Sequence, residues 1–262
     1  MCAAMIRKAG CFLHFSKAMT TVSQPQSLPP SQLPGRRYDR YFFAAITVAL
    51  LVTAFAGFAR TYYLAGLSAA KLPAPIVHVH AVLQSAWMLL LLVQMLLVSA
   101  NRVPLHRKLG IAGFLLIAAM VPVAVMVVAN QLHRFASQGD AALSFSLIPA
   151  WEVSNFAVLA GLALALRRYP VAHKRLIILA TVAMMPAAVS RIPVPLIRQW
   201  TPWEVIAFIV AIAAYDIWSM RRIHAATLAG AGFIGVFLFG CMPLGHTEAW
   251  HVVARWMQSW NL

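Results

Sequence analysis

The feature that most constrains this chain is a succession of seven apolar runs, which begins at Tyr41 and continues almost to the C-terminus. Each run is close to the roughly 20 residues that an α-helix needs to cross the hydrocarbon core of a bilayer. An open strand in that position would leave backbone groups unpaired in lipid, so each run is expected to be helical. The runs are 41–59, 75–100, 110–129, 146–166, 176–190, 203–220 and 225–244.

The composition excludes a water-soluble globule. Hydrophobic residues make up 62% of the 262-residue chain and charged residues only 10%, whereas soluble domains carry about 25% charged residues. Without that polar coat the apolar surface has to face lipid. The sequence therefore predicts an all-α integral membrane bundle of seven transmembrane helices.

The charge balance is strongly basic, with 21 Lys and Arg residues against six Asp and Glu residues. In a soluble protein this excess would suggest binding to nucleic acid. Here the bases lie between apolar runs, which is typical of topology signals and of contact with anionic lipid headgroups. The expected partners are therefore the lipid bilayer and its anionic headgroups, not nucleic acid.

The distribution of bases between alternate loops predicts the orientation of the bundle. Fifteen Lys and Arg residues fall on the side of the N-terminus and six on the other side. Bases in short loops are retained in the cytoplasm. The N-terminus is therefore predicted to be inside and, with seven spans, the C-terminus outside.

Two segments flank the predicted transmembrane domain of residues 41–244. Residues 1–40 are rich in Ser, Pro, Gln and Arg and are expected to form a disordered cytoplasmic tail, in which Met19 is an alternative start. Residues 245–262 are expected to form an interfacial amphipathic helix. Its apolar stripe repeats every three or four residues and comprises Trp250, Val253, Trp256 and Trp260.

Polar residues of the second run share one face of the predicted helix. His80, Gln84 and Gln94 fall in register with Trp87 and Leu91 at helical spacing. Polar side chains at membrane depth are costly unless they are paired or functional. This face is therefore expected to look into the bundle, either to bond neighbouring helices or to carry a functional histidine.

A weak internal repeat places two histidines at the same depth. The segments LHRKLG at 105–110 and AHKRL at 172–176 each follow a short loop that contains a proline. Their histidines, His106 and His173, begin inward-starting spans. Neutral imidazoles in this position could ligate haem iron, could bind a phosphate headgroup together with the neighbouring bases, or could be ordinary interfacial residues.

A second set of polar residues lies near the outer ends of the predicted spans: His78, His80, Glu152, Asn155, Arg191 and His246. They could converge, either as a Glu152–Arg191 ion pair or as a pocket for a small ligand or a proton-carrying chain. On the inner side, Asp216 is expected to pair with a base. Motifs of hydrolases and kinases are absent from the sequence.

These residues resemble the pattern of a known family. HVH at 78–80, Trp87, Gln94, Arg102 and HRKLG at 106–110 are similar to the His…Gln…Arg…His-Arg-x-x-Gly core of an uncharacterised family of bacterial multi-pass membrane proteins. The resemblance covers about residue 41 to the C-terminus. It implies the fold and a location in the bacterial inner (cytoplasmic) membrane, but no activity. A looser similarity connects the histidines to b-type cytochromes.

Two functional hypotheses follow. In the first, the protein is a redox or haem-binding protein, with haem b held by His106 and His173 at the inner face and by His80 and His246 at the outer face. In the second, it is a non-enzymatic transport or membrane-accessory protein, whose histidines are structural or form a proton relay. The sequence alone leaves both hypotheses open.

Overall fold

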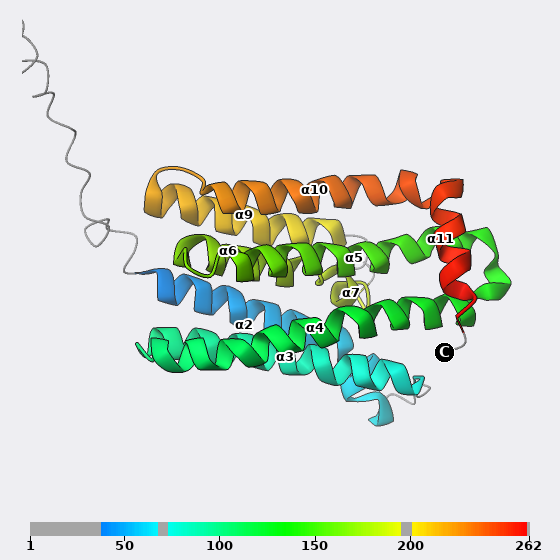
Figure 1. Cartoon of the computed structure of the whole chain (residues 1–262), viewed down its shortest axis with the longest axis horizontal. Helices are drawn as coiled ribbons and strands as arrows, with labels where there is room; N and C mark the ends of the chain where they lie inside the picture. The colour runs from blue at the N-terminus through cyan, green and yellow to red at the C-terminus, as the bar shows by residue number, and fades with distance from the viewer. Residues whose placement is uncertain (1–37, 68–72, 195–200, 261–262) are drawn as a thin grey trace, which may run out of the picture.

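The computed structural model describes residues 38–67, 73–194 and 201–260, which fold into an elongated helical bundle (Figure 1). Seven helical spans in this part of the chain are long and apolar enough to cross a membrane, as the sequence predicts. They are α2 (Asp39–Phe58, continued by the π-helical turn Ala59–Tyr63), α3 (Pro75–Ser99), α4 (Val103–Arg134), α5 (Asp140–Ala165), α6 (Pro170–Val182) with α7 (Pro186–Val189), α9 (Thr201–Met220) and α10 (Ala225–Gly245). A shorter helix, α11 (Glu248–Gln258), follows the last span.

Several helices extend beyond the apolar runs that predict them. Helix α2 begins at Asp39, inside the segment expected to be a tail, while residues 1–37 lie outside the described residues. Helix α4 begins at Val103, seven residues before the expected start, and has a proline in its first turn. Proline is tolerated there because the first backbone N–H groups of a helix have no partner within it. Hydropathy thus locates the crossing segment, whereas capping and turn residues set the helix ends.

The fifth span is divided at a proline. Helix α6 ends at Val182, and α7 begins at Pro186 after a turn of three residues. Pro186 occupies the first turn of α7, where a backbone N–H would have no partner within the helix, so its absence costs no hydrogen bond. Pro122 behaves differently, because α4 continues through it as one helix.

The divided fifth span is the centre of the bundle. In the most apolar 18-residue segment of this span 61% of the residues are buried, whereas in every other span that share is 33% or less. Helix α6 packs against α5, α10 and α9, and its side chains Leu176, Ile178, Leu179 and Val182 are almost fully buried. The other spans therefore present most of their apolar surface outward, as lipid contact requires.

The bundle has two chemically different ends. At one end α2 begins and the α3–α4, α5–α6 and α9–α10 connections lie together (Figure 1). We call this the basic end, because the connections and the first turns after them carry Arg102, Arg107, Lys108, Arg167, Arg168, Arg221 and Arg222. We call the other the distal end, where α11 crosses the bundle.

Helix α11 packs across the distal ends of α4 and α5. Its buried face carries His251, Ala254 and Met257, and Trp250 Nε1 donates a 2.8 Å hydrogen bond to the carbonyl of Leu143. The opposite face is exposed, with Trp256 at 60% exposure. The expected apolar stripe is thus divided: Trp250 faces the bundle and Trp256 faces outward. An interfacial position for Trp256 stays a prediction.

Candidate functional site

The polar stripe of α3 faces the bundle, as predicted. Trp87 is 4% exposed, and its Nε1 donates a 3.2 Å hydrogen bond to Thr181 Oγ1 of α6. Gln84 reaches the sulfur of Met184 at 3.7 Å. On the opposite face Val82 and Leu89 are 64% and 57% exposed. The stripe therefore joins α3 to the central span.

The structure brings His106 and His173 together at the basic end. Their ring centroids lie 6.5 Å apart, with the ring planes at 78°. Each histidine occupies the first turns of a helix that has a proline at its start, so both enter the bundle at a similar depth. The shared depth follows from the repeat in the sequence. Their lateral proximity comes from the packing of the α3–α4 and α5–α6 hairpins.

Neighbouring groups hold the imidazole of His173 and the backbone of His106. His173 Nδ1 lies 2.8 Å from the carbonyl oxygen of Ala163, and because a carbonyl only accepts, Nδ1 carries the proton. In the neutral tautomer with the proton on Nδ1, the Nε2 atom carries the lone pair that can act as a ligand. Gln94 Nε2 donates a 3.3 Å hydrogen bond to the backbone carbonyl of His106. Ala163 of α5 thus orients the ring of His173, and Gln94 of α3 holds the backbone of His106.

Two polar atoms of this site are buried without a hydrogen-bond partner in the described part of the chain, namely His106 Nδ1 and Gln94 Oε1. Most buried polar atoms in folded proteins are bonded, so unpaired ones frequently mark a site completed by a ligand, an ion or water. The histidine pair therefore has unused hydrogen-bonding or ligating capacity.

The separation of the two ring centroids can be compared with that of two imidazoles that ligate one ion. A metal lies about 2 Å from an imidazole nitrogen, so rings on opposite sides of one ion have centroids about 6 Å apart. The observed 6.5 Å is close to that separation. Among the described residues no three or more His, Cys, Asp or Glu side chains form a metal-binding group. An ion here would need further ligands from outside the protein, and the macrocycle of haem supplies four.

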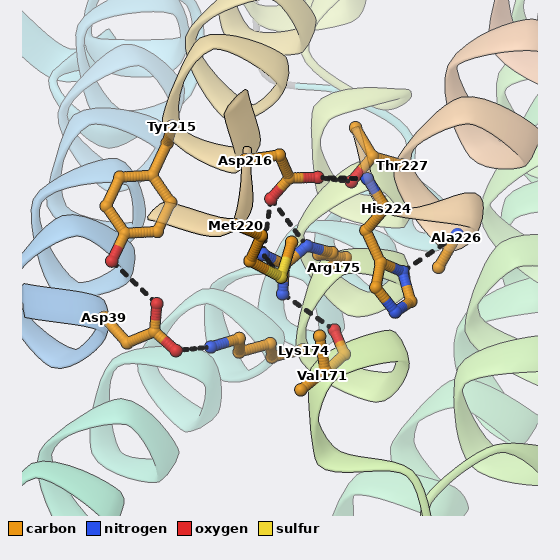
Figure 2. A network of polar contacts seen from close by, with 10 residues as sticks. All are labelled: Asp39, Val171, Lys174, Arg175, Tyr215, Asp216, Met220, His224, Ala226 and Thr227. Atoms are coloured by element: carbon orange, nitrogen blue, oxygen red, sulfur yellow. Dashed lines mark hydrogen bonds and ion pairs between the residues drawn. The ribbon is translucent and has the colours of Figure 1, made fainter. Parts of the chain in front are cut away.

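A buried ion pair lies next to His173 in the sequence and connects three helices (Figure 2). Arg175 of α6 and Asp216 of α9 form an ion pair, and their side chains are 1% and 0% exposed. The second oxygen of Asp216 accepts hydrogen bonds from Thr227 Oγ1 at 2.6 Å and from the backbone N–H of His224 at 3.0 Å. The prediction that Asp216 pairs with a base is confirmed.

His224 contributes to this cluster through its backbone and as a helix cap. Its Nδ1 accepts a 3.0 Å hydrogen bond from the backbone N–H of Ala226 at the start of α10. Burial and the nearby Arg175 guanidinium lower the pKa of the His224 ring. The ring is therefore neutral near pH 7, which is the form that can accept the capping bond.

Asp39 forms a second polar cluster that the sequence interpretation missed. It forms an ion pair with Lys174 and accepts a 2.7 Å hydrogen bond from the hydroxyl of Tyr215 (Figure 2). Assigning residues 1–40 to a disordered tail hid this contact. The available signal was a single acid immediately before an apolar run, a position that suits the first turn of a helix.

At the distal end, His80 and Glu152 each lie within electrostatic range of Arg191. Burial lowers the pKa of Arg191, although the Glu152 carboxylate opposes this effect. Among the described residues no contact ion pair joins Glu152 to Arg191, so the ion-pair alternative does not hold as a direct contact. Of the residues predicted near the outer ends, His80 and Glu152 thus lie near Arg191, but Glu152 and Arg191 do not form a contact ion pair.

His78 and His246 lie away from this group. His78 Nδ1 lies 3.1 Å from the hydroxyl of Tyr62. His246 Nδ1 lies 3.2 Å from Ser144 Oγ, which is also 3.0 Å from His251 Nε2. Helices α3 and α10 lie on opposite sides of the bundle (Figure 1), so the structure does not bring His80 and His246 together.

No protein-family model, curated protein or solved structure matches this chain. The resemblance to a bacterial multi-pass membrane family therefore stays a prediction. The functional argument rests on the geometry of the site.

Proposed function

We propose that this multi-pass membrane protein is a bacterial inner-membrane redox protein that binds haem b between His106 and His173. The observation that carries the proposal is the 6.5 Å separation of these two rings at the ends of two hairpins. Two neutral imidazoles from different helices are suitable axial ligands for haem iron. The haem, when bound, supplies one-electron chemistry.

The protein's own residues would hold and tune this site. The carbonyl of Ala163 fixes the tautomer of His173 and increases the basicity of its free nitrogen. Gln94 holds the backbone of His106. Arg107 lies within electrostatic range of the His106 ring and offers a cation for an anionic haem substituent.

The ion pairs of the basic end would act as positioning groups. Lys174 and Arg175 follow His173 directly and are bound to Asp39 of α2 and Asp216 of α9. These contacts restrain the first turn of α6 from two sides. The imidazole of His173 is thereby held in place before any ligand binds, which lowers the entropy lost on binding.

The basic end is proposed to face the cytoplasm. Its connections and the first turns after them carry seven Lys or Arg residues in the described part of the chain, in addition to Lys174 and Arg175. Such a concentration of bases is typical of the cytoplasmic side and attracts anionic headgroups.

The alternative function is a non-enzymatic transport or membrane-accessory role in which the histidines relay protons. The edge-to-face contact of His106 with His173, together with the buried, unpartnered Nδ1 of His106, also suits proton transfer without iron. This function requires no prosthetic group. The presence of haem in the purified protein therefore separates the two.

Visible absorbance of protein purified from haem-replete cells tests the proposal. A Soret band and a reducible α-band are expected in the wild type. His106→Ala and His173→Ala should each abolish the low-spin spectrum, because a six-coordinate iron loses an axial ligand in either variant. His246→Ala, at the distal end, is the matched control and should retain it. A colourless wild type would reject haem binding, and low-spin spectra that survive both substitutions would reject these ligands.

A further inference from the structure

The distal half of the bundle contains a cavity of about 70 Å³ between α5, the α6–α7 turn, α9 and α10. Its walls are mostly apolar, and the ring of Trp151 packs edge to face on Phe237 at one side, with centroids 4.2 Å apart. Trp151, Glu152 and Asn155 of α5 are the polar or amphipathic residues among those that line it. The cavity is separate from the histidine pair of the basic end.

Two of these polar groups have buried atoms with unused hydrogen-bonding capacity. Asn155 is 6% exposed, and its Oδ1 has no hydrogen-bond partner in the described part of the chain. The buried Trp151 Nε1 likewise has none among the residues described. One atom is an acceptor and the other a donor. Water can satisfy both, because it donates and accepts.

The size of the cavity decides between water and an organic ligand. Pockets for drug-sized ligands measure about 300 to 1,000 Å³. One water molecule needs roughly 10 to 15 Å³ of the space available to its centre. The cavity therefore has room for a few water molecules but not for an organic cofactor. A buried water requires two or more polar contacts, and Trp151, Glu152 and Asn155 are the lining residues of α5 whose side chains carry such groups.

Glu152 lies among several titratable groups without forming a contact ion pair in the described part of the chain. Arg191 follows α7, and His80 of α3 lies within range of Arg191. Cys241 of α10 lines the cavity, and its thiol is directed to the carbonyl of Leu238 at 3.6 Å. On α9, Glu204 precedes the cavity residue Val205, and its carboxylate oxygens have no partner among the described residues.

We propose that Glu152 is a proton-binding site served by water in this cavity. A proton from hydronium in bulk solvent is relayed by a cavity water, which accepts one proton as it donates another, and the carboxylate becomes a neutral carboxylic acid. The water molecules bridge it to Trp151 Nε1 and Asn155 Oδ1. A carboxylate at membrane depth without a contact counter-ion is more readily accommodated as the neutral acid. This site does not depend on haem binding.

Infrared difference spectroscopy of the full-length protein in lipid nanodiscs, titrated with pH, tests the proposal. The Glu204→Gln background leaves Glu152 as the buried acid of the distal half. We expect a carboxylic C=O band that disappears at high pH and shifts in D₂O. Adding Glu152→Gln should remove the band completely. Adding Trp151→Phe should shift its frequency, because one water contact is lost.

Glu248→Gln, which alters an exposed acid, is the control and should leave the band unchanged. A band that survives Glu152→Gln would overturn the assignment to Glu152. A band that does not respond to D₂O, or that is unaffected by Trp151→Phe, would overturn the role of water in the cavity. The His106→Ala and His173→Ala variants should retain the band, so failure of the haem proposal is distinguishable from failure of this one.

Discussion

The two ends of the bundle differ in whether their buried charged side chains form contact ion pairs. At the basic end Arg175 and Asp216 are almost completely buried and form a contact ion pair. At the distal end Glu152 and Arg191 interact electrostatically, but they form no contact pair within the described residues. A contact ion pair therefore joins helices at the basic end. At the distal end Glu152 and Arg191 are not engaged in such a pair within the described residues and can bind protons or ligands.

The distal helices are held by close backbone packing instead. A Cβ atom on Gly57 of α2 would overlap the backbone of Ala188 in α7. A Cβ atom on Gly245 would lie 2.7 Å from the carbonyl oxygen of Ser144. Small residues at helix contacts are typical of membrane bundles, because association there depends on tight packing and not on the hydrophobic effect. Such packing holds the helices without using the polar side chains.

The largest effect is expected from Asp216→Ala at the basic end. The substitution leaves Arg175 buried without its counter-ion and also removes the acceptor of Thr227 and of the His224 backbone. We expect the free energy of unfolding to fall by about 3 to 5 kcal/mol. Denaturant unfolding in detergent micelles, followed by circular dichroism, measures it.

Glu248→Ala is the matched control for that experiment. It breaks the ion pair between Arg255 and Glu248, whose side chains are 46% and 73% exposed. The loss of stability should be below about 1 kcal/mol, because solvent screens exposed pairs. Equal effects of the two substitutions would contradict the structural role assigned to the basic end.

An intermediate effect is expected from Gly57→Ala at the distal end. The added methyl group meets the backbone of Ala188, which cannot move aside as a flexible side chain can. We expect destabilisation of about 1 to 3 kcal/mol. Gly161→Ala is the control, since a Cβ there meets nothing within 4 Å. It should be neutral or stabilising by up to about 1 kcal/mol. A neutral Gly57→Ala would show that backbone contact does not hold this end.

The smallest effect concerns the pH dependence of stability at the basic end. The pKa of His224 is lowered in the folded state, so the unfolded chain binds this proton more tightly. The contribution of His224 is complete above its unfolded pKa of about 6.5 and is lost as the pH falls from there through the folded pKa. His224→Asn keeps a capping acceptor and removes the titration.

Unfolding of wild type and His224→Asn between about pH 7.5 and pH 5 measures this contribution. The wild type should lose more stability than the variant over that range. Identical pH profiles would mean that the neutral His224 ring does not contribute to the cap of α10. The comparison also separates this histidine from the ion pair, because Asp216 accepts from the His224 backbone, which the variant retains.

The sequence by itself determined the crossing segments, the inward face of α3 and the common depth of His106 and His173. These properties depend on hydropathy and helical spacing, which are local along the chain. The pairing of Asp216 with a base was predictable as well, because an isolated carboxylate at that depth requires a counter-ion. The sequence did not indicate which base would reach it.

Only the tertiary structure decided which polar groups meet. His106 meets His173 because two hairpins pack with those faces together. His80 and His246 have similar predicted depths, but they belong to α3 and to the end of α10, and these helices lie on opposite sides of the bundle (Figure 1). Asp39 reaches Lys174 because α2 begins earlier than its apolar run. Hydropathy specifies the depth of a residue along the membrane normal. The rotation and lateral position of each helix depend on side-chain packing between segments far apart in sequence, and that packing is what assembles or separates the sites.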